Sequence, residues 1–296
     1  MASLPLLFAF NSAIMTILTL TLYIAVVALN WNLLFGHAGV WSIGQLGFFA
    51  IGAYSSAFIS KAWASPLIGI IVGVLVAVLI SLGLSFATLK LRATYFALAT
   101  FGFQEVVRGI ILVIHPSTIF DLPHLEILNL SFILYNGLGY YYSFLLLLFV
   151  TLVVHMIVLT SSVGTAVIAL RYSELRAVSL GVDVVKTRGI LFAISAALTS
   201  CAGSLYAHYT NSVGVAILGF DNFLLYFVIL AFGGIGSFYG PLVSSFLWTI
   251  LDFPLRIYYA EMRLIIMGCL VLLILMFLEK GITDIWKKII AAISKL

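Results

Sequence analysis

Charged residues are scarce in this sequence. Aspartate, glutamate, lysine and arginine together make up 8% of the 296 residues, whereas a soluble domain carries about a quarter. Hydrophobic residues make up 64% of the chain, and the mean hydropathy is +1.25. This composition excludes a soluble globular domain, and it also excludes a disordered chain, which needs low hydrophobicity and high charge. A polytopic membrane protein is the class that remains.

The absence of several sequence motifs limits the kinds of reaction and cofactor that this chain could support. The two cysteines, Cys201 and Cys269, lie in apolar segments without metal-site spacing, so we expect buried thiols and no disulfide framework. No serine lies in a G-x-S-x-G motif, so a membrane enzyme would lack a recognisable nucleophile. There is also no G-x-x-x-x-G-K-[ST] phosphate loop. We therefore expect no enzyme activity and no cofactor in this chain, with any ATP and magnesium bound by separate subunits.

The apolar runs are continuous and show no strand alternation, which predicts an all-α fold with about nine membrane crossings (range about eight to ten). The N-terminus has no basic region, so we expect its first segment to stay as a membrane anchor. Segments with closely spaced glycines are candidates for broken or re-entrant helices. We expect one transmembrane domain over residues 1–296, with spans at 4–31, 36–60, 66–89, 93–114, 140–160, 189–209, 220–235, 238–253 and 262–278.

The basic residues are distributed unevenly over the two sides of such a bundle. Ten of the 14 lysines and arginines fall on one side, three fall on the other, and Arg108 lies within a span. The positive-inside rule then places the N-terminus outside and the C-terminus in the cytoplasm. The loop 161–188 would be cytoplasmic, and the loop 115–139, which has no lysine or arginine, would be extracytoplasmic. The basic residues on the cytoplasmic side are Lys90, Arg92, Arg171, Arg176, Lys186, Arg188, Lys280, Lys287, Lys288 and Lys295, and those on the other side are Lys61, Arg256 and Arg263.

The most charged stretch of the chain, within the expected cytoplasmic loop, predicts a helix of about two turns. Ser173 can cap its N-terminus, Glu174 suits the positive end of the helix dipole, and Gly181 fits a C-terminal cap. Leu175 and Val178 lie three residues apart and form an apolar ridge. Two interpretations stay open from these residues alone: an interfacial helix that lies on lipid headgroups, and a docking element for a cytoplasmic partner.

Two further charge clusters fall in or beside the spans. Glu105 and Arg108 are the charges well inside an expected span, and at i, i+3 they can pair. They are either part of a translocation path, where they would grip or gate a zwitterion, or a structural ion pair. At the outer ends of the spans, we expect a solvated cap at Asp252 with Arg256 and at the neighbouring Glu261 and Arg263. With Asp221 and the loop 115–139, this region could contact an extracytoplasmic binding protein.

Several blocks of the sequence resemble one family. The segment from Glu174 to Gly181 is similar to the EAA-type coupling loop of ABC importer permeases, which docks into a cleft of the ATP-binding subunit. More of the chain, from about 36 to 241, is similar to branched-chain amino-acid permeases of the LivM type. Departures are Gln45 in place of histidine, Ala93-Thr94 in place of Gly-Asp, and Arg176 in place of alanine. The blocks are FGHAGVWSIGQLGFFAIGAY, LKLRATYFALATFGFQEVVR, ELRAVSLGVDVVKTRGILFAISAALTSCAGSLYAHY and FGGIGSFYGP.

This resemblance implies a permease subunit of an ATP-binding-cassette importer in a prokaryotic inner membrane, which moves branched-chain or related amino acids inward by alternating access. Its implied partners are a second permease, two cytoplasmic ATP-binding subunits, an extracytoplasmic solute-binding protein and the lipid bilayer, and no nucleic acid. The alternative is an ion-coupled secondary transporter or channel, for which Glu105 would be the ion site. The candidate coupling residues are Ser173, Glu174, Leu175, Arg176, Ala177 and Gly181, and the candidate path residues are Gln45, Tyr54, Glu105 and Arg108.

Overall fold

Helices form along each of the apolar runs that the structure describes. The computed structural model describes residues 12–63, 65–87, 93–115, 117–120, 122 and 138–277. The long helices are α2 (Ser12–Asn32), α3 (Gln45–Trp63), α4 (Pro66–Ala87), α5 (Ala93–Ile114), α7 (Leu138–Thr160), α10 (Val184–Thr210), α11 (Phe220–Gly233), α12 (Gly240–Tyr258) and α13 (Ala260–Phe277). The short elements are a π-helical turn at Leu33–His37, a 3-10 turn at Val215–Leu218, α8 (Ser162–Tyr172), α9 (Glu174–Ser179), β1 (Ile119–Phe120) and β2 (Ser212–Val213).

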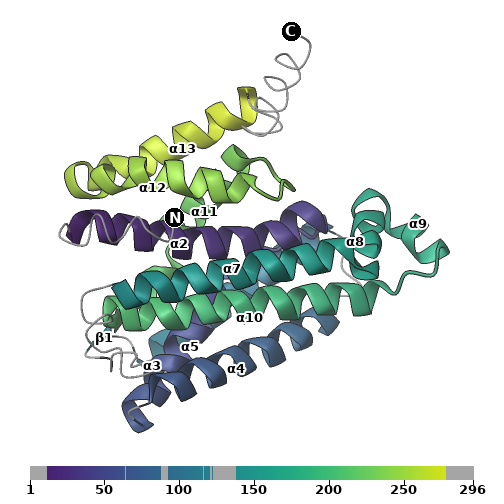
Figure 1. The fold of residues 1–296 in the computed structure, drawn as a ribbon. Coiled ribbons are helices and arrows are strands. Elements are labelled where there is room, and N and C mark those ends of the chain that lie inside the picture. The colour runs from purple at the N-terminus through teal and green to yellow at the C-terminus, as the bar shows by residue number, and fades with distance from the viewer. Residues whose placement is uncertain are drawn as a thin grey trace.

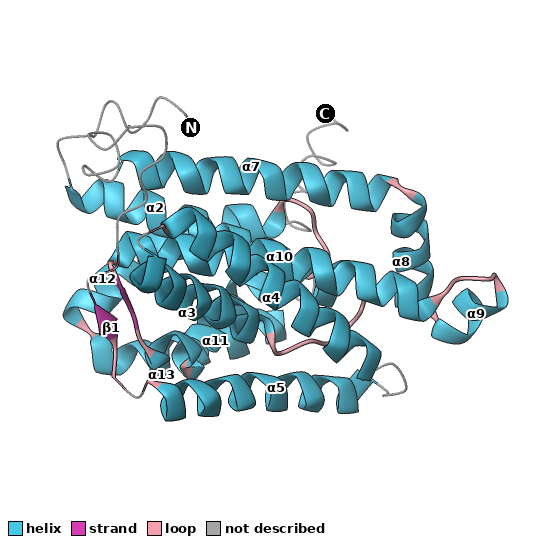
Figure 2. Cartoon of the chain, turned by 90° about the horizontal axis from the view of Figure 1, so that it is seen from below, coloured by secondary structure: helices cyan, strands magenta, loops and turns pink. Residues whose placement is uncertain are grey.

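The long helices run roughly along one direction, and each reverses the direction of the one before it (Figure 1). α8 and α9 project from one end of this bundle, which we call the α9 end. β1 and β2 form a two-stranded antiparallel pair, with Ile119 opposite Val213, at the other end, the β1 end. Viewed from below, α7 and α5 lie on opposite sides of the bundle (Figure 2).

The apolar surface identifies the bundle as a membrane fold. Five of the described helical segments are long and apolar enough to span a bilayer: 14–37, 66–86, 94–114, 138–160 and 184–210. Only 22% of the residues in the apolar windows of α4 and α5 are buried within the chain, so most of their side chains face outward. The expected all-α polytopic fold is confirmed.

The expected number of crossings depends on the shorter helices. α11 has 14 residues, fewer than the roughly 20 that cross the hydrocarbon core. α12 and α13 also contain only shorter apolar stretches, of the length expected for broken or re-entrant segments. The count of about nine crossings therefore remains a prediction.

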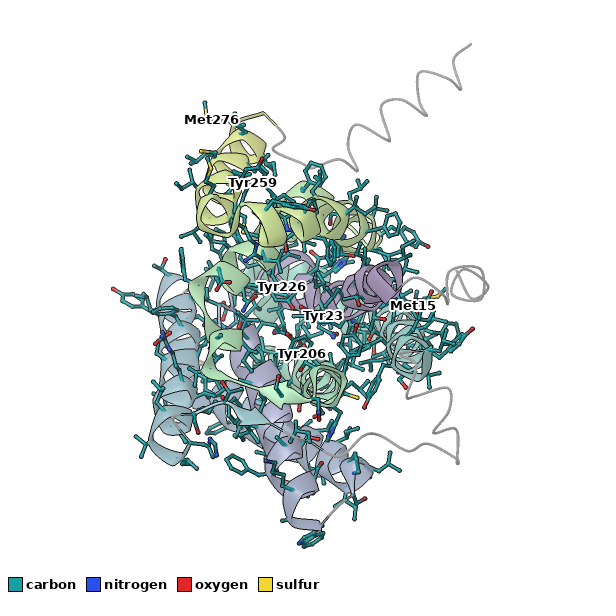
Figure 3. The ribbon with its side chains drawn as sticks, turned by 90° about the vertical axis from the view of Figure 1, so that its left-hand side faces the viewer. Met15, Tyr23, Tyr206, Tyr226, Tyr259 and Met276 are labelled. Carbon is teal, nitrogen blue, oxygen red and sulfur yellow. The ribbon has the colours of Figure 1, made fainter. Side chains whose placement is uncertain are left out.

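The centre of the bundle is aromatic where α2, α10 and α11 meet. Figure 3, which looks along the bundle from the β1 end, shows Tyr23, Tyr206 and Tyr226 near its middle. The rings of Tyr23 and Tyr206 have centroids 4.9 Å apart and join α2 to α10. Tyr226 on α11 is buried. Such rings fill the wider spaces between helices, while the narrow ones require small residues.

Glycines allow α3, α4 and α10 to approach closely. A Cβ atom at Gly203 of α10 would overlap the carbonyl oxygen of Phe49 of α3, and one at Gly52 of α3 would overlap that of Ser200. At Gly73 of α4, a Cβ would lie 3.1 Å from the carbonyl oxygen of Gly52. Small residues at these contacts thus let the helix backbones approach closely.

Replacing Gly203 by alanine is expected to destabilise the protein, because the new methyl group would force α10 away from the backbone of α3. Overpacking of this kind costs about 1–3 kcal/mol. Thermal unfolding in detergent, followed by tryptophan fluorescence, should show a lower midpoint. Gly102→Ala on α5 is the matched control, since nothing lies within 4 Å of a Cβ there. Equal midpoints for the two variants would contradict the close contact.

Candidate functional site

The helix α9 begins and ends where the sequence predicts. The Ser173 hydroxyl accepts a hydrogen bond from the backbone N–H of Arg176 at 3.4 Å, and Glu174 occupies the first turn. At the other end, Gly181 has a φ of +81°, a conformation that favours glycine. The backbone N–H of Val182 donates to the Ala177 carbonyl at 3.0 Å, which closes the last turn. The predicted caps are confirmed on a helix of six residues.

The helix α9 is held to the bundle on one side and is bare on the other. Ala177 is fully buried, and the Glu174 carboxylate forms a 2.8 Å salt bridge with Arg188 on α10. Leu175 is 83% exposed and Leu180 is 79% exposed. Figures 1 and 2 show α9 as the most protruding helix at its end of the bundle. An apolar ridge presented in this way indicates a surface that something else covers.

Gln45, a candidate path residue, lies inside the subunit. Its side chain is fully buried, and its amide nitrogen donates to Ser195 Oγ at 2.9 Å and also to Thr199 Oγ1. Ser195 Oγ in turn donates to the Asn30 carbonyl at 3.0 Å. His155 Nε2 lies 3.0 Å from Asn30 Oδ1. Gln45 thus belongs to a buried polar network that joins α2, α3, α7 and α10.

The other three candidate path residues do not converge on Gln45. Tyr54 is buried on α3, and its hydroxyl has no hydrogen-bond partner among the described residues. Glu105 and Arg108 form the predicted ion pair, at 3.6 Å, with 41% and 45% of their side chains exposed on α5. The four residues therefore divide between the interior of the subunit and its outer surface, and their role in translocation stays a prediction.

The expected outer cap at the β1 end is wrong in its solvation. Asp252 is buried and bonds to Arg263 through two contacts, of 2.6 and 3.2 Å, because α12 and α13 lie side by side there. Arg263 also reaches Asp221 on α11 at 3.3 Å. The side chains of Arg256 and Glu261 lie outside the described residues, so the pairing of Asp252 with Arg256 stays a prediction. This cluster fastens three helices together in the interior.

The loop at 115–139, which we expect to be extracytoplasmic, is described only in part. Residues 123–137 lie outside the described residues, so contact with a solute-binding protein stays a prediction. The basic residues Lys90 and Arg92 and the tail lysines beyond 277 also lie outside them. The candidate orientation therefore depends on fewer groups at the α9 end, namely Arg171, Arg176, Lys186 and Arg188.

The cysteines differ from each other in burial. Both are free thiols, but Cys201 is half-buried and Cys269 is exposed on α13. The expected burial is therefore wrong for Cys269, because α13 packs on the bundle with only one side.

A glycine turn at the α9 end has a partner that local sequence reasoning does not reveal. Gly234 and Gly236 both have positive φ, +91° and +83°, in the turn between α11 and α12. The buried side chain of Asn32 accepts from the Gly236 N–H at 2.9 Å and donates to the Ser237 carbonyl at 2.8 Å. A residue 204 positions away in the chain thus holds the turn. An asparagine that breaks the apolar end of a span is the one signal in the sequence that could have indicated it.

The fold and these contacts define an all-α, multi-pass membrane protein with a short, capped helix at one end. The chain belongs to the family of the permease component of branched-chain amino acid transport systems, whose model matches residues 13–275. It is thus a multi-pass inner-membrane component of a transport system that includes other subunits, and the family consists of transport components, not enzymes.

Two relatives support the same assignment. The chain is 27% identical over 298 residues to the high-affinity branched-chain amino acid transport system permease protein LivM of Escherichia coli (strain K12). It is equally similar to the LivM protein of Salmonella typhimurium (strain LT2). Each match covers 90% of this chain and 69% of the relative. No solved structure matches the chain.

The buried carboxylate at the β1 end is expected to matter more for stability than the exposed one. Asp252→Ala leaves the Arg263 guanidinium buried without its two-contact partner, which costs about 3–5 kcal/mol. Asp221→Ala removes one longer contact from a half-exposed carboxylate, which costs less than about 1 kcal/mol. Thermal unfolding of both variants in detergent checks this order. A larger loss for Asp221→Ala would contradict the assignment.

Proposed function

We propose that the chain is the membrane permease subunit of an ATP-binding-cassette importer for branched-chain or related amino acids. Family membership supports the transport role, and the relatives named above carry the substrate class in their names. In this proposal a second permease completes the membrane part, two cytoplasmic subunits bind ATP and magnesium, and an extracytoplasmic protein delivers the solute. The chain itself performs no covalent chemistry.

The exposed apolar surface of the rigid helix α9 is the observation that best supports the proposal. The helix is capped at both ends and tied to the bundle, yet Leu175 and Val178 on α9 are 83% and 54% exposed, and Leu180 directly after it is 79% exposed. A rigid helix that offers an apolar ridge suits a cleft in another protein. A helix that only lay on headgroups would not need the salt bridge from Glu174 to Arg188.

The contacts around α9 suggest how movement would spread. A push on α9 would pass through Ala177 and the Glu174–Arg188 pair to α10. α10 packs tightly on α3 and α4 through glycines, so it would move these helices as one body. Alternating access would then come from rocking of this body against the second permease.

Disrupting α9 is expected to release the ATP-binding subunits. Glu174→Lys places a positive charge beside Arg188, and Gly181→Arg forces a side chain into a backbone conformation with φ of +81°. In a pull-down from detergent analysed by mass spectrometry, the wild type should recover an ATPase and both variants should lose most of it.

Lys61→Glu serves as the matched control for charge, because Lys61 is exposed in the last turn of α3 at the β1 end. It should retain the ATPase. If the wild type recovers no ATPase while it remains folded, the importer proposal fails and an ion-coupled carrier takes its place, with Glu105 as the next residue to mutate.

The orientation is tested by single cysteines at the two ends of the bundle. In a Cys201→Ala, Cys269→Ala background, Val178→Cys on α9 should react with an impermeant maleimide in inside-out vesicles. Lys61→Cys should react in right-side-out vesicles, because the α9 end is cytoplasmic in this proposal. Both side chains are exposed in the subunit. The reverse pattern would contradict the orientation and, with it, docking of cytoplasmic subunits on α9.

A further inference from the structure

A pocket of about 650 Å³ opens at the α9 end, between α11, the end of α8 and the loop that follows the π-helical turn. Its volume is within the range of about 300–1,000 Å³ that is typical of small-molecule sites. Its walls are mainly aromatic and include one cation. The residues that matter for its chemistry are Trp31, Phe35, Trp41, Phe223, Phe227 and Arg171.

The aromatic walls form a site for an apolar group. Trp31 is 1% exposed and forms the deep side of the pocket, whereas Trp41 is 56% exposed and lies at the mouth. The indole N–H of Trp31 already donates to the Ser42 carbonyl at 2.7 Å, so Trp31 offers its ring and not a donor. The rings of Trp31 and Phe223 have centroids 5.5 Å apart. A branched aliphatic side chain would bury its surface against such walls.

Arg171, in the last turn of α8, supplies the charge. Its stem passes over Gly39, where a Cβ would lie 3.3 Å from the Arg171 Cα and Cγ. Its Nη1 would lie 2.7 Å from a Cβ at Gly236. Both glycines have positive φ, +65° and +83°, so the backbone bends there without a side chain in the way. The guanidinium forms no ion pair with a carboxylate among the described residues, and no acidic residue lines the pocket.

We infer that this pocket binds an apolar amino acid, with the substrate carboxylate on Arg171 and the aliphatic side chain among the aromatic rings. A guanidinium matches a carboxylate by two parallel hydrogen bonds. The ammonium group would face the aromatic rings at the mouth rather than an acid. This inference rests on the proposed transport function and names a substrate subsite at the cytoplasmic end of the path.

The site is joined directly to the docking helix. Arg171 lies two residues before Ser173, which caps α9, and next to the glycine turn that Asn32 holds. A carboxylate on Arg171 would therefore pull on the junction between α8 and α9. Substrate occupancy and the position of α9 are coupled in this arrangement.

Binding of radiolabelled leucine to the full-length chain in lipid nanodiscs tests the inference. The wild type is expected to bind, and Arg171→Gln, which keeps the first two carbons of the stem over Gly39, should bind at least about tenfold more weakly. Arg176→Gln is the matched control, because Arg176 is an exposed arginine that does not line the pocket, and it should bind like the wild type. Trp41→Ala, which removes an exposed ring, should also weaken binding.

Competitors identify which end of the substrate the site holds. 4-Methylpentanoate, which has the carboxylate and the branched chain, should displace leucine, and 3-methylbutylamine, which lacks the carboxylate, should not. Equal binding by the wild type and Arg171→Gln, or no binding by the wild type, would overturn the inference. So would displacement by short-chain phosphatidylglycerol without displacement by 4-methylpentanoate, which would assign the pocket to lipid.

The same preparations separate this inference from the proposed function. If the wild type and Arg171→Gln co-purify with an ATPase but leucine binding does not depend on Arg171, the pocket is rejected as a substrate site and the importer proposal stands. If no ATPase co-purifies while leucine binding still depends on Arg171, the importer proposal is rejected and the binding site stands.

Discussion

The helix bundle is built around the close contact of α3, α4 and α10. In a bilayer the hydrophobic effect does not drive one apolar helix against another, so helices associate through tight packing and interhelical hydrogen bonds. Gly52 and Gly203 remove the side chains that would otherwise hold α3 and α10 apart. This leaves backbone against backbone, and the buried hydroxyl of Ser204 then donates to the Gly52 carbonyl at 2.9 Å. Three helices become one body, to which the others are attached.

Interhelical hydrogen bonds and an ion pair join the helices at places where no glycine contact does. Gln45 and Ser195 connect α3 to α10, and Asn30 extends the connection to α2 and α7. Each of these groups would be costly in lipid without a partner. At the β1 end, the buried pair of Arg263 and Asp252 connects α13 to α12 in the same way. A movement that begins at the α9 end therefore meets a packed interior and is carried across it rather than absorbed locally.

Local features of the chain could be predicted from the sequence, and long-range ones could not. Ser173 and Gly181 bound α9 as expected, because capping depends on a few consecutive residues. The spans follow from the length of the apolar runs. The bonds from Asp252 to Arg263 on the next helix were not predicted, because they depend on how α12 and α13 pack against each other. The burial of Gln45 could likewise not be predicted from the sequence, because it depends on contacts with residues some 150 positions away in the chain.

In the proposed function, ATP bound by other subunits drives this permease through α9. The most direct measurement is leucine uptake by the reconstituted complex in proteoliposomes, with ATP supplied on the α9 side, on the opposite side, or replaced by an ion gradient. We expect uptake only with ATP on the α9 side, and we expect Gly181→Arg to abolish it. Uptake that an ion gradient drives without ATP, and that survives Gly181→Arg, would contradict the proposed function.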